Sequence, residues 1–212
     1  MLKRQKIHTI LIFLFIMAFT IPSNAEEEIE DLIDIFESNS KIIAVLECKK
    51  TISFDLPANE KVLWSGSKGY FGAFLTNARF FVISTSSGTW HYLYLKSDPE
   101  NSITSLSPHI ALLVSGYRII SYNTLSNQFM ETHFPLRDEV IAVEAGKHVV
   151  VVITSSRILG LAAEFSSFIE VRLRIRETVE DVKVTSTKVS VRTSDRLLSF
   201  TTKSSVWYKH GL

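Results

Sequence analysis

The segment Thr76–Trp90 reads TNARFFVISTSSGTW, and related segments return three times at intervals of 39 residues. The later copies read SGYRIISYNTLSNQF (Ser115–Phe129), TSSRILGLAAEFSSF (Thr154–Phe168) and TSDRLLSFTTKSSVW (Thr193–Trp207). Each copy starts with Thr or Ser, carries Arg three positions later and ends with a large aromatic residue. With Arg at about one residue in twenty, three further in-phase arginines would arise by chance roughly once in 10,000 trials. The chain therefore contains an internal repeat.

Each repeat is predicted to form four short β-strands. Val, Ile, Phe, Tyr and Thr dominate the expected strands, whereas Gly, Ser, Pro and Asn separate them. In the second repeat the expected strands are 101–106, 109–115, 118–123 and 128–134, and in the third they are 140–145, 148–154, 157–161 and 168–175. The four repeats are expected at about 59–98, 99–137, 138–176 and 177–212.

The third strand of each repeat is apolar on both faces. Positions 80, 119, 158 and 197 hold Phe, Ile, Ile and Leu, and the positions that follow them hold Phe, Ile, Leu and Leu. Since neighbouring residues of a strand point to opposite sides, such a strand must be covered on both sides, as in sheets stacked face to face. The fourth strand of the third repeat alternates instead, with Ile169, Val171, Leu173 and Ile175 against charged residues. That pattern is typical of an outer strand with one face exposed to solvent.

Four strands per repeat of about 40 residues, with buried middle strands, resemble a β-propeller blade. The order of the strands is similar to that in WD-repeat, Kelch and quinoprotein-type blades, over about residues 59–210. The GH and WD signatures of WD repeats and the double glycine of Kelch are absent, so the resemblance is to the architecture alone. It implies an all-β fold, a small propeller of four to five four-stranded blades, and it implies no activity.

Residues 26–58 precede the full repeats. A hairpin of a further, incomplete blade is predicted from Lys41–Glu47 and Thr51–Leu56. Lys41 lies one residue after position 40, where the 39-residue spacing of the arginines would place the preceding one. Residues 27–37 favour a short helix because Ile29, Leu32, Ile33 and Phe36 have helical spacing, and a strand is the alternative. We expect a ring of five blades, the last completed by N-terminal strands. A four-bladed ring with an attached hairpin and an open fan closed by a second copy are the alternatives.

The first 25 residues are predicted to be a secretory signal peptide. Lys3, Arg4 and Lys6 precede the apolar run Ile7–Ile21, and small residues lead to a cleavage site after Ala25. The chain is therefore expected to be exported, to the periplasm or the medium, with no membrane span after cleavage. Cys48 is the single cysteine, which excludes an intrachain disulfide, and it is expected to be a buried thiol.

The composition excludes two classes of protein. Apolar residues make up 46% of the 212 residues, so a wholly disordered chain is not expected. With 23 basic and 22 acidic residues, the chain lacks the excess positive charge of a dedicated nucleic-acid binder.

The in-phase arginines are the first candidate binding site. Arg79, Arg118, Arg157 and Arg196 are expected at equivalent turns on one face, where a ring of cations would hold an anionic ligand. Acidic residues keep the same phase, at Glu60, at Asp98 and Glu100 around Pro99, at Asp138 and at Glu177. Four acids beside four arginines favour repeated salt bridges within the fold over a ligand site.

Two further sets of residues are candidates. Trp90, Phe129, Phe168 and Trp207 would serve a lectin as sugar-stacking platforms, although packing between blades is the favoured interpretation. Arg172, Arg174 and Arg176, extended by Lys183, would contact an acidic partner or lipid headgroups, although a solvated edge strand is favoured.

No motif for catalysis, a cofactor or a metal is recognised. His109 and His148 are 39 residues apart, so they are assigned to separate repeats and the histidines are not expected to cluster. We expect a non-enzymatic module that binds or assembles with a protein, without a cofactor. A carbohydrate-binding lectin is the first alternative, and a hydrolase or lyase that uses the axial channel is the second. Polysaccharide binding and self-association that closes the ring are further partner expectations.

Overall fold

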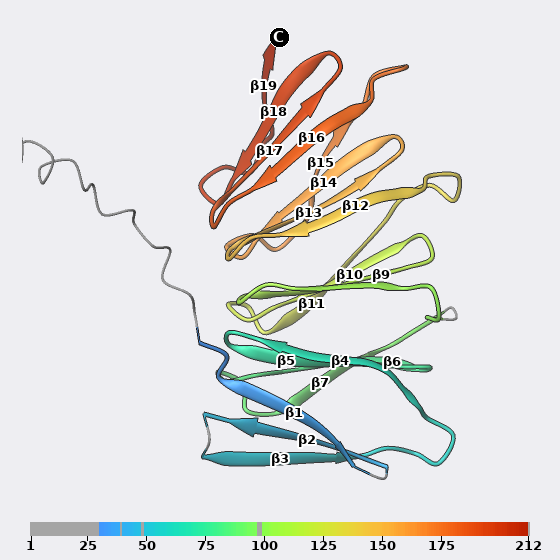
Figure 1. Cartoon of the computed structure of the whole chain (residues 1–212), viewed down its shortest axis with the longest axis vertical. Helices are drawn as coiled ribbons and strands as arrows, with labels where there is room; N and C mark the ends of the chain where they lie inside the picture. Colours follow the sequence, from blue (N-terminus) through green and yellow to red (C-terminus); the bar gives the residue numbers. More distant parts are fainter. Residues whose placement is uncertain (1–29, 39, 48, 97–98, 212) are drawn as a thin grey trace, which may run out of the picture.

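The computed structural model describes residues 30–38, 40–47, 49–96 and 99–211. Within them it contains five antiparallel sheets and no helix (Figure 1). The first sheet has three strands, β1 (Ile33–Ser38), β2 (Lys41–Leu46) and β3 (Lys50–Asp55). The other four sheets have four strands each and follow the 39-residue repeat. The all-β fold with blade-sized units is therefore confirmed.

The four-stranded sheets follow one another along the chain. The second sheet is β4 (Val62–Lys68), β5 (Phe71–Thr76), β6 (Arg79–Ser84) and β7 (Trp90–Tyr94). The third is β8 (Ile103–Leu106), β9 (Ile110–Ser115), β10 (Arg118–Asn123) and β11 (Gln128–His133). The fourth is β12 (Val140–Ala145), β13 (Val149–Thr154), β14 (Arg157–Ala162) and β15 (Ile169–Arg172). The fifth is β16 (Val179–Val184), β17 (Lys188–Thr193), β18 (Arg196–Thr201) and β19 (Tyr208–Gly211).

The sheets are stacked face to face into an open fan. Figure 1 shows the first sheet at one end of the stack and the fifth sheet at the other, with the remaining sheets between them in chain order. The expected further blade of N-terminal strands is present as the three-stranded first sheet, but it lies at the opposite end of the stack from the fifth sheet, so the expected ring is not closed. The fifth sheet takes all four strands from the last repeat, and β1, β2 and β3 pair among themselves, so no strand position is left for them in the fifth sheet.

The expected helix over 27–37 is also wrong for the part that the structure describes. Ile33–Ser38 forms β1, which pairs with β2 from Ile33 opposite Leu46 to Ser38 opposite Lys41. Pairing with β2 outweighs the helical spacing because a strand places Ile33 and Ile35 on the side that packs against the second sheet. The signal peptide, residues 27–29, Cys48 and Asp98 lie outside the described residues.

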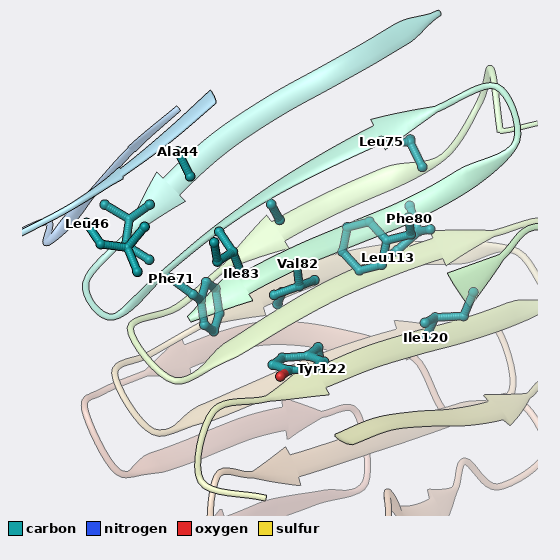
Figure 2. Close-up of a cluster of buried hydrophobic side chains, with 13 residues drawn as sticks. Ala44, Leu46, Phe71, Leu75, Phe80, Val82, Ile83, Leu113, Ile120 and Tyr122 are labelled. Atoms are coloured by element: carbon teal, nitrogen blue, oxygen red, sulfur yellow. The ribbon is translucent and has the colours of Figure 1, made fainter. Parts of the chain in front are cut away.

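Apolar side chains fill the spaces between the sheets. One cluster joins the first three sheets, and Figure 2 shows it with Ala44 and Leu46 from β2, Phe71 and Val82 from the second sheet, and Leu113 and Tyr122 from the third. Two further clusters join the third sheet to the fourth and the fourth to the fifth. The hydrophobic core is therefore continuous along the stack.

The third strand of a sheet is buried on both faces in the middle of the stack but on one face only at its end. Phe80, Phe81, Ile119 and Ile120 are fully buried, so these strands are covered on both faces as predicted. In the fifth sheet Leu198 is buried but Leu197 is 37% exposed, because no sheet covers its outer side. The prediction of two covered faces is therefore wrong for this last strand.

The expected fourth strand of the third repeat is shorter than predicted. β15 ends at Arg172, and Ile175 is 94% exposed in the connection to β16 instead of facing the core. Arg176 has a φ of 66°, a left-handed conformation that belongs to a turn and ends any extended pairing there.

Neighbouring sheets also touch through their backbone at the turns between first and second strands. The Tyr70 amide donates to the Pro108 carbonyl, and the His148 amide donates to the Ser186 carbonyl. Gly146 lies so close to the backbone of Thr185 that a Cβ there would overlap its carbonyl oxygen. Close stacking at this edge of the fan therefore requires glycine at this position.

Candidate functional site

The four in-phase arginines lie at the edge of the stack where β6, β10, β14 and β18 begin. We call this edge the arginine face; it also carries the connections between one sheet and the next, on the right in Figure 1. All four arginine side chains are 3–13% exposed, and each forms a salt bridge to a carboxylate.

Three of the four sites share a triad of acid, arginine and threonine. In the fifth sheet Arg196 donates to both Glu177 oxygens, at 2.8 and 2.9 Å, and the Thr193 hydroxyl donates to Oε1 at 2.6 Å. The same contacts join Glu60, Arg79 and Thr76 in the second sheet. In the fourth sheet the members are Asp138, Arg157 and Thr154, and Arg157 also contacts Glu170 at 3.0 Å. Each triad ties the start of a sheet to its second hairpin.

The third sheet satisfies its arginine differently. Arg118 donates to both oxygens of Glu131, each at 2.8 Å, and Glu131 belongs to β11 rather than to the opening of the repeat. Arg118 Nη1 is buried and has no hydrogen-bond partner. The acid in this pair therefore comes from the fourth strand, at a position where the next repeat has Glu170, which contacts Arg157.

These contacts shift the acidities of the carboxyl groups. Burial alone would raise the pKa of Glu177, but hydrogen bonds from Arg196, Thr193 and the Arg174 amide outweigh it and lower the pKa to about 2. For Glu60 the same opposition between burial and the Arg79 and Thr76 hydrogen bonds also leaves the pKa lowered. The pairs are therefore charged throughout the ordinary pH range, and binding of an external anion by these arginines stays a prediction.

The in-phase aromatic residues lie between the sheets. Trp90 meets the edge of Phe74 at a centroid distance of 5.0 Å, and Phe129 packs similarly against Tyr122 at 5.0 Å. Trp207 is 7% exposed, and its indole N–H donates to the Ile169 carbonyl at 2.9 Å. Phe168 packs against the cluster between the third and fourth sheets. Their rings contact other side chains of the core, and a sugar-stacking role stays a prediction.

The second sheet adds an aromatic cage that sequence reasoning missed. The guanidinium carbon of Arg79 lies 4.5–5.7 Å from the centroids of four rings, those of Phe54, Phe81, Tyr92 and Tyr94. Beside it is a cavity of about 240 Å³, lined in part by Asn59, Asn77 and Tyr94. In phase with Tyr92 the later sheets have Glu131, Glu170 and Lys209, and in phase with Tyr94 they have His133, Arg172 and Gly211, so this four-ring cage breaks the repeat.

Two histidines that were expected to lie apart are in contact. The rings of His109 and His148 stack at a centroid distance of 4.5 Å, and Tyr70 stacks on the other side of His109 at 5.0 Å. The expectation that the histidines do not cluster is wrong, because residues 39 positions apart occupy equivalent places in adjacent sheets. Burial, followed by the charges of His148 and Lys147, lowers the pKa of His109 to about 4. The 39-residue spacing was the signal that could have found this column.

The described residues contain neither a metal-binding cluster nor a membrane-spanning helix. Among the described residues, no group of three or more His, Cys, Asp or Glu side chains has a geometry that could hold a metal ion. The same part of the chain contains no helix long and apolar enough to cross a bilayer.

The basic row of the fourth sheet lies at the arginine face and is open to solvent. The side chain of Arg172 is 80% exposed and contacts Glu170 at 3.2 Å, and that of Arg174 is 64% exposed and lies 3.9 Å from Asp195. Arg176 is exposed in the same connection, and Lys183 follows in β16. The structure thus places the three arginines in and beside a turn rather than along one strand.

Solved structures with a similar fold are β-propeller proteins. Hsv2 of Kluyveromyces lactis matches over 81% of this chain and 58% of its own, at 11% identity and a TM-score of 0.43. Prp20p of Saccharomyces cerevisiae matches over 79% of this chain and 56% of its own, at 10% identity and a TM-score of 0.40. HIRA matches over 84% of this chain and 55% of its own, at 10% identity and a TM-score of 0.43. The chain has a β-propeller-like repeat architecture. It spans little more than half of each of these chains.

No protein-family model and no curated protein sequence matches this chain. The partner is therefore inferred below from the surfaces of this chain.

Proposed function

We propose that this chain is an exported, non-enzymatic binding module that packs a protein partner against the outer side of its first sheet. Three side chains define this docking face, Phe36 of β1 with Ile43 and Val45 of β2. Phe36 pairs with Ile43 across the two strands, and it is 54% exposed. The exposed apolar centre of this sheet face is the observation that carries the proposal.

The alternation of the strands separates this face from the core. Ile33, Ile42 and Ala44 are fully buried against the second sheet. Their neighbours in sequence therefore point to the other side, where Figure 1 shows no further sheet. Inside the stack, such apolar sheet faces are each covered by the next sheet, so a polypeptide with a sheet of its own is the partner that fits.

The edges of the docking face add polar groups that suit a protein partner. Lys41 and Asp55 form an exposed salt bridge at 3.2 Å across β2 and β3, and Thr51 and Ser53 share the outer side of β3. An apolar centre with a hydrated polar rim is the usual anatomy of a protein–protein interface.

The test is a pull-down with tagged residues 26–212, which contain every described strand, from the envelope and medium of the native host. We expect a stoichiometric protein that is lost with Phe36→Asp and retained with Leu197→Asp, the matched exposed residue on the outer side of the fifth sheet. Retention of the protein by both variants would overturn the assignment of the face.

The lectin alternative has its own outcome in the same experiment. Retention on a polysaccharide matrix without a protein partner would replace the proposed function with carbohydrate binding. A second copy of the chain as the captured partner would support association that extends the open stack. A hydrolase or lyase remains the third expectation from the sequence, and no side chain described above favours it.

A further inference from the structure

Two aliphatic side chains at the arginine face have no role in the core. Leu136 is 82% exposed and Ile175 is 94% exposed, more than any other large apolar residue that the structure describes. They lie 39 residues apart, in the connections from β11 to β12 and from β15 to β16, so they occupy equivalent places beside adjacent sheets. Single exposed aliphatic residues are ordinary, but two at the same repeat position form a pattern.

Both connections are closed by an equivalent turn hydrogen bond. The Asp138 amide donates to the Pro135 carbonyl at 2.9 Å, and the Glu177 amide donates to the Arg174 carbonyl at 3.0 Å. Leu136 and Ile175 are therefore each the second residue of a four-residue turn. The last residue of each turn, Asp138 or Glu177, is fixed by its buried arginine. Leu136 and Ile175, the two tips, thus project from an anchored backbone. Because this backbone is already ordered, binding through the tips costs little conformational entropy.

Arginines surround the two tips. Arg137 follows Leu136. Arg174 and Arg176 flank Ile175, and Arg172 lies three residues before Ile175. All four are exposed. In the two connections, Asp138 and Glu177 are neutralised by Arg157 and Arg196. The remaining acids are Glu139, Glu170 beside Arg172 and Asp195 beside Arg174, which are fewer than the four exposed arginines. The surface around the tips is therefore positively charged.

We propose that this surface, Leu136 and Ile175 with Arg137, Arg172, Arg174 and Arg176, docks the protein on a bilayer that contains anionic phospholipid. The aliphatic tips enter the boundary between headgroups and acyl chains, and the guanidinium groups contact lipid phosphates. A bilayer fits better than a folded protein because the apolar groups are two separate projections rather than a continuous face. Figure 1 shows these connections extending outward at the edge of the stack.

This inference goes beyond the proposed protein binding and uses a different surface. The first sheet lies at one end of the fan, whereas the two tips lie beside its third, fourth and fifth sheets (Figure 1). Protein binding and bilayer docking can therefore be lost separately.

The experiment is sedimentation of residues 26–212 with vesicles of phosphatidylcholine alone or mixed equally with phosphatidylglycerol. This segment omits Ile7–Ile21, an apolar run that would itself bind vesicles. We expect binding to the anionic vesicles that weakens with added salt. Leu136→Ser with Ile175→Ser should weaken binding by at least about tenfold, since most of the apolar contact is lost. Arg176→Gln should weaken it by about fivefold.

The matched control is Leu125→Ser, in the turn between β10 and β11 at the opposite edge of the stack, where the leucine is 59% exposed. This variant should bind within about twofold of the unchanged chain, since a surface substitution away from the contact has little effect. A circular dichroism spectrum and a urea midpoint for each variant separate loss of binding from loss of fold.

Three outcomes would overturn the proposal. These are no binding to anionic vesicles, equal binding to neutral vesicles, and unchanged binding by the double tip variant. Loss of a captured protein, rather than vesicles, in that variant would assign the tips to a protein instead. Phe36→Asp tests the proposed function separately, because it should lose the protein partner and keep vesicle binding.

Discussion

The first and fifth sheets end the same stack but are built differently. The fifth sheet has four strands, and Glu177 and Arg196 form a buried pair at its edge, with side chains 0% and 7% exposed. The first sheet has three strands, and at nearly the same repeat phase Lys41 pairs with Asp55, with side chains 56% and 77% exposed. One end is fixed by a desolvated ion pair, and the other by a solvated one.

Their outer surfaces differ in the same sense. In β17 the buried residues Val189 and Val191 alternate with Ser190 and Arg192, so the open side of this strand is polar, and Leu197 of β18 is an apolar residue on the same side, 37% exposed. The open side of the first sheet has Phe36, Ile43 and Val45 at its centre. A polar outer surface is what a terminal repeat needs to remain exposed. The outer side of the fifth sheet therefore suits exposure to solvent better than that of the first sheet, which is the proposed docking face.

The largest expected effect is at the aromatic residue of the fifth sheet. Trp207→Ala should lower the free energy of unfolding by about 3–5 kcal/mol, because the ring is buried against Phe200. The first sheet has Thr51 at the in-phase position, so it lacks this contribution. Urea denaturation followed by tryptophan fluorescence and circular dichroism measures the change. A loss below about 1 kcal/mol would mean that the ring does not anchor the sheet.

The next effect is at the ion pairs. Glu177→Gln should cost about 2–4 kcal/mol because it leaves Arg196 buried without a charged partner. Asp55→Asn in the first sheet is the matched control, and it should cost no more than about 1 kcal/mol because that pair is solvated. Equal costs in urea denaturation would contradict the difference between the two ends.

Lowering the pH should remove the stabilising contribution of the Glu177–Arg196 pair. The folded-state pKa of Glu177 is about 2, below the ordinary value of 4.5, so its contribution is complete above pH 4.5 and is lost as the pH falls toward 2. Urea midpoints at pH 7, 4 and 2.5 should decrease in that order. Glu177→Gln should reduce the slope over this interval, whereas Asp55→Asn should leave it nearly intact.

The stacked histidines add a smaller dependence at higher pH. The pKa of His109 falls from 6.5 to about 4, chiefly through burial, so folding favours the neutral ring. Stability should therefore be lost progressively as the pH falls from 6.5 to 4. His109→Phe keeps a ring for stacking and should flatten that interval of the curve of midpoint against pH. An unchanged curve would show that another group titrates there.

The smallest expected effect is at the docking face. Phe36→Asp should change the free energy of unfolding by no more than about 0.5 kcal/mol, because the side chain is 54% exposed on the open side of β1. The same substitution should abolish capture of the protein partner. A large loss of stability would instead mean that Phe36 belongs to the core.

The repeat made the architecture predictable, and its ends were where prediction failed. The in-phase arginines and the paired apolar residues at 80 and 81 indicated blades with covered middle strands, as the structure has them. The helix expected at 27–37 was wrong over Ile33–Ser38 because pairing with β2 gives this segment a two-residue period, which buries Ile33 and leaves Phe36 exposed on the other side. Ring closure was inferred from the repeat, but the polar residues that alternate along β17 were the contrary signal.

At the candidate sites, the 39-residue spacing predicted where the arginines lie better than it predicted which acids they contact. It placed Arg79, Arg157 and Arg196 beside the acids that open their repeats, but Arg118 pairs instead with Glu131 of β11, which is in phase with Glu170. The exposure of Leu136 and Ile175 was not predicted either, because Ile175 continued an apolar alternation that the turn at Arg176 interrupts.

The stacking of His109 on His148 has a consequence for how such a chain can change over time. Because each sheet stands one place beyond the last, adding or subtracting 39 from a residue number gives its neighbour in the next sheet. Gene duplication or unequal recombination by one whole repeat would therefore keep every row of side chains aligned. An insertion or deletion of a few residues inside a strand would displace each later row. The number of sheets can thus change by whole repeats, whereas the 39-residue period must be kept for the rows of side chains to align.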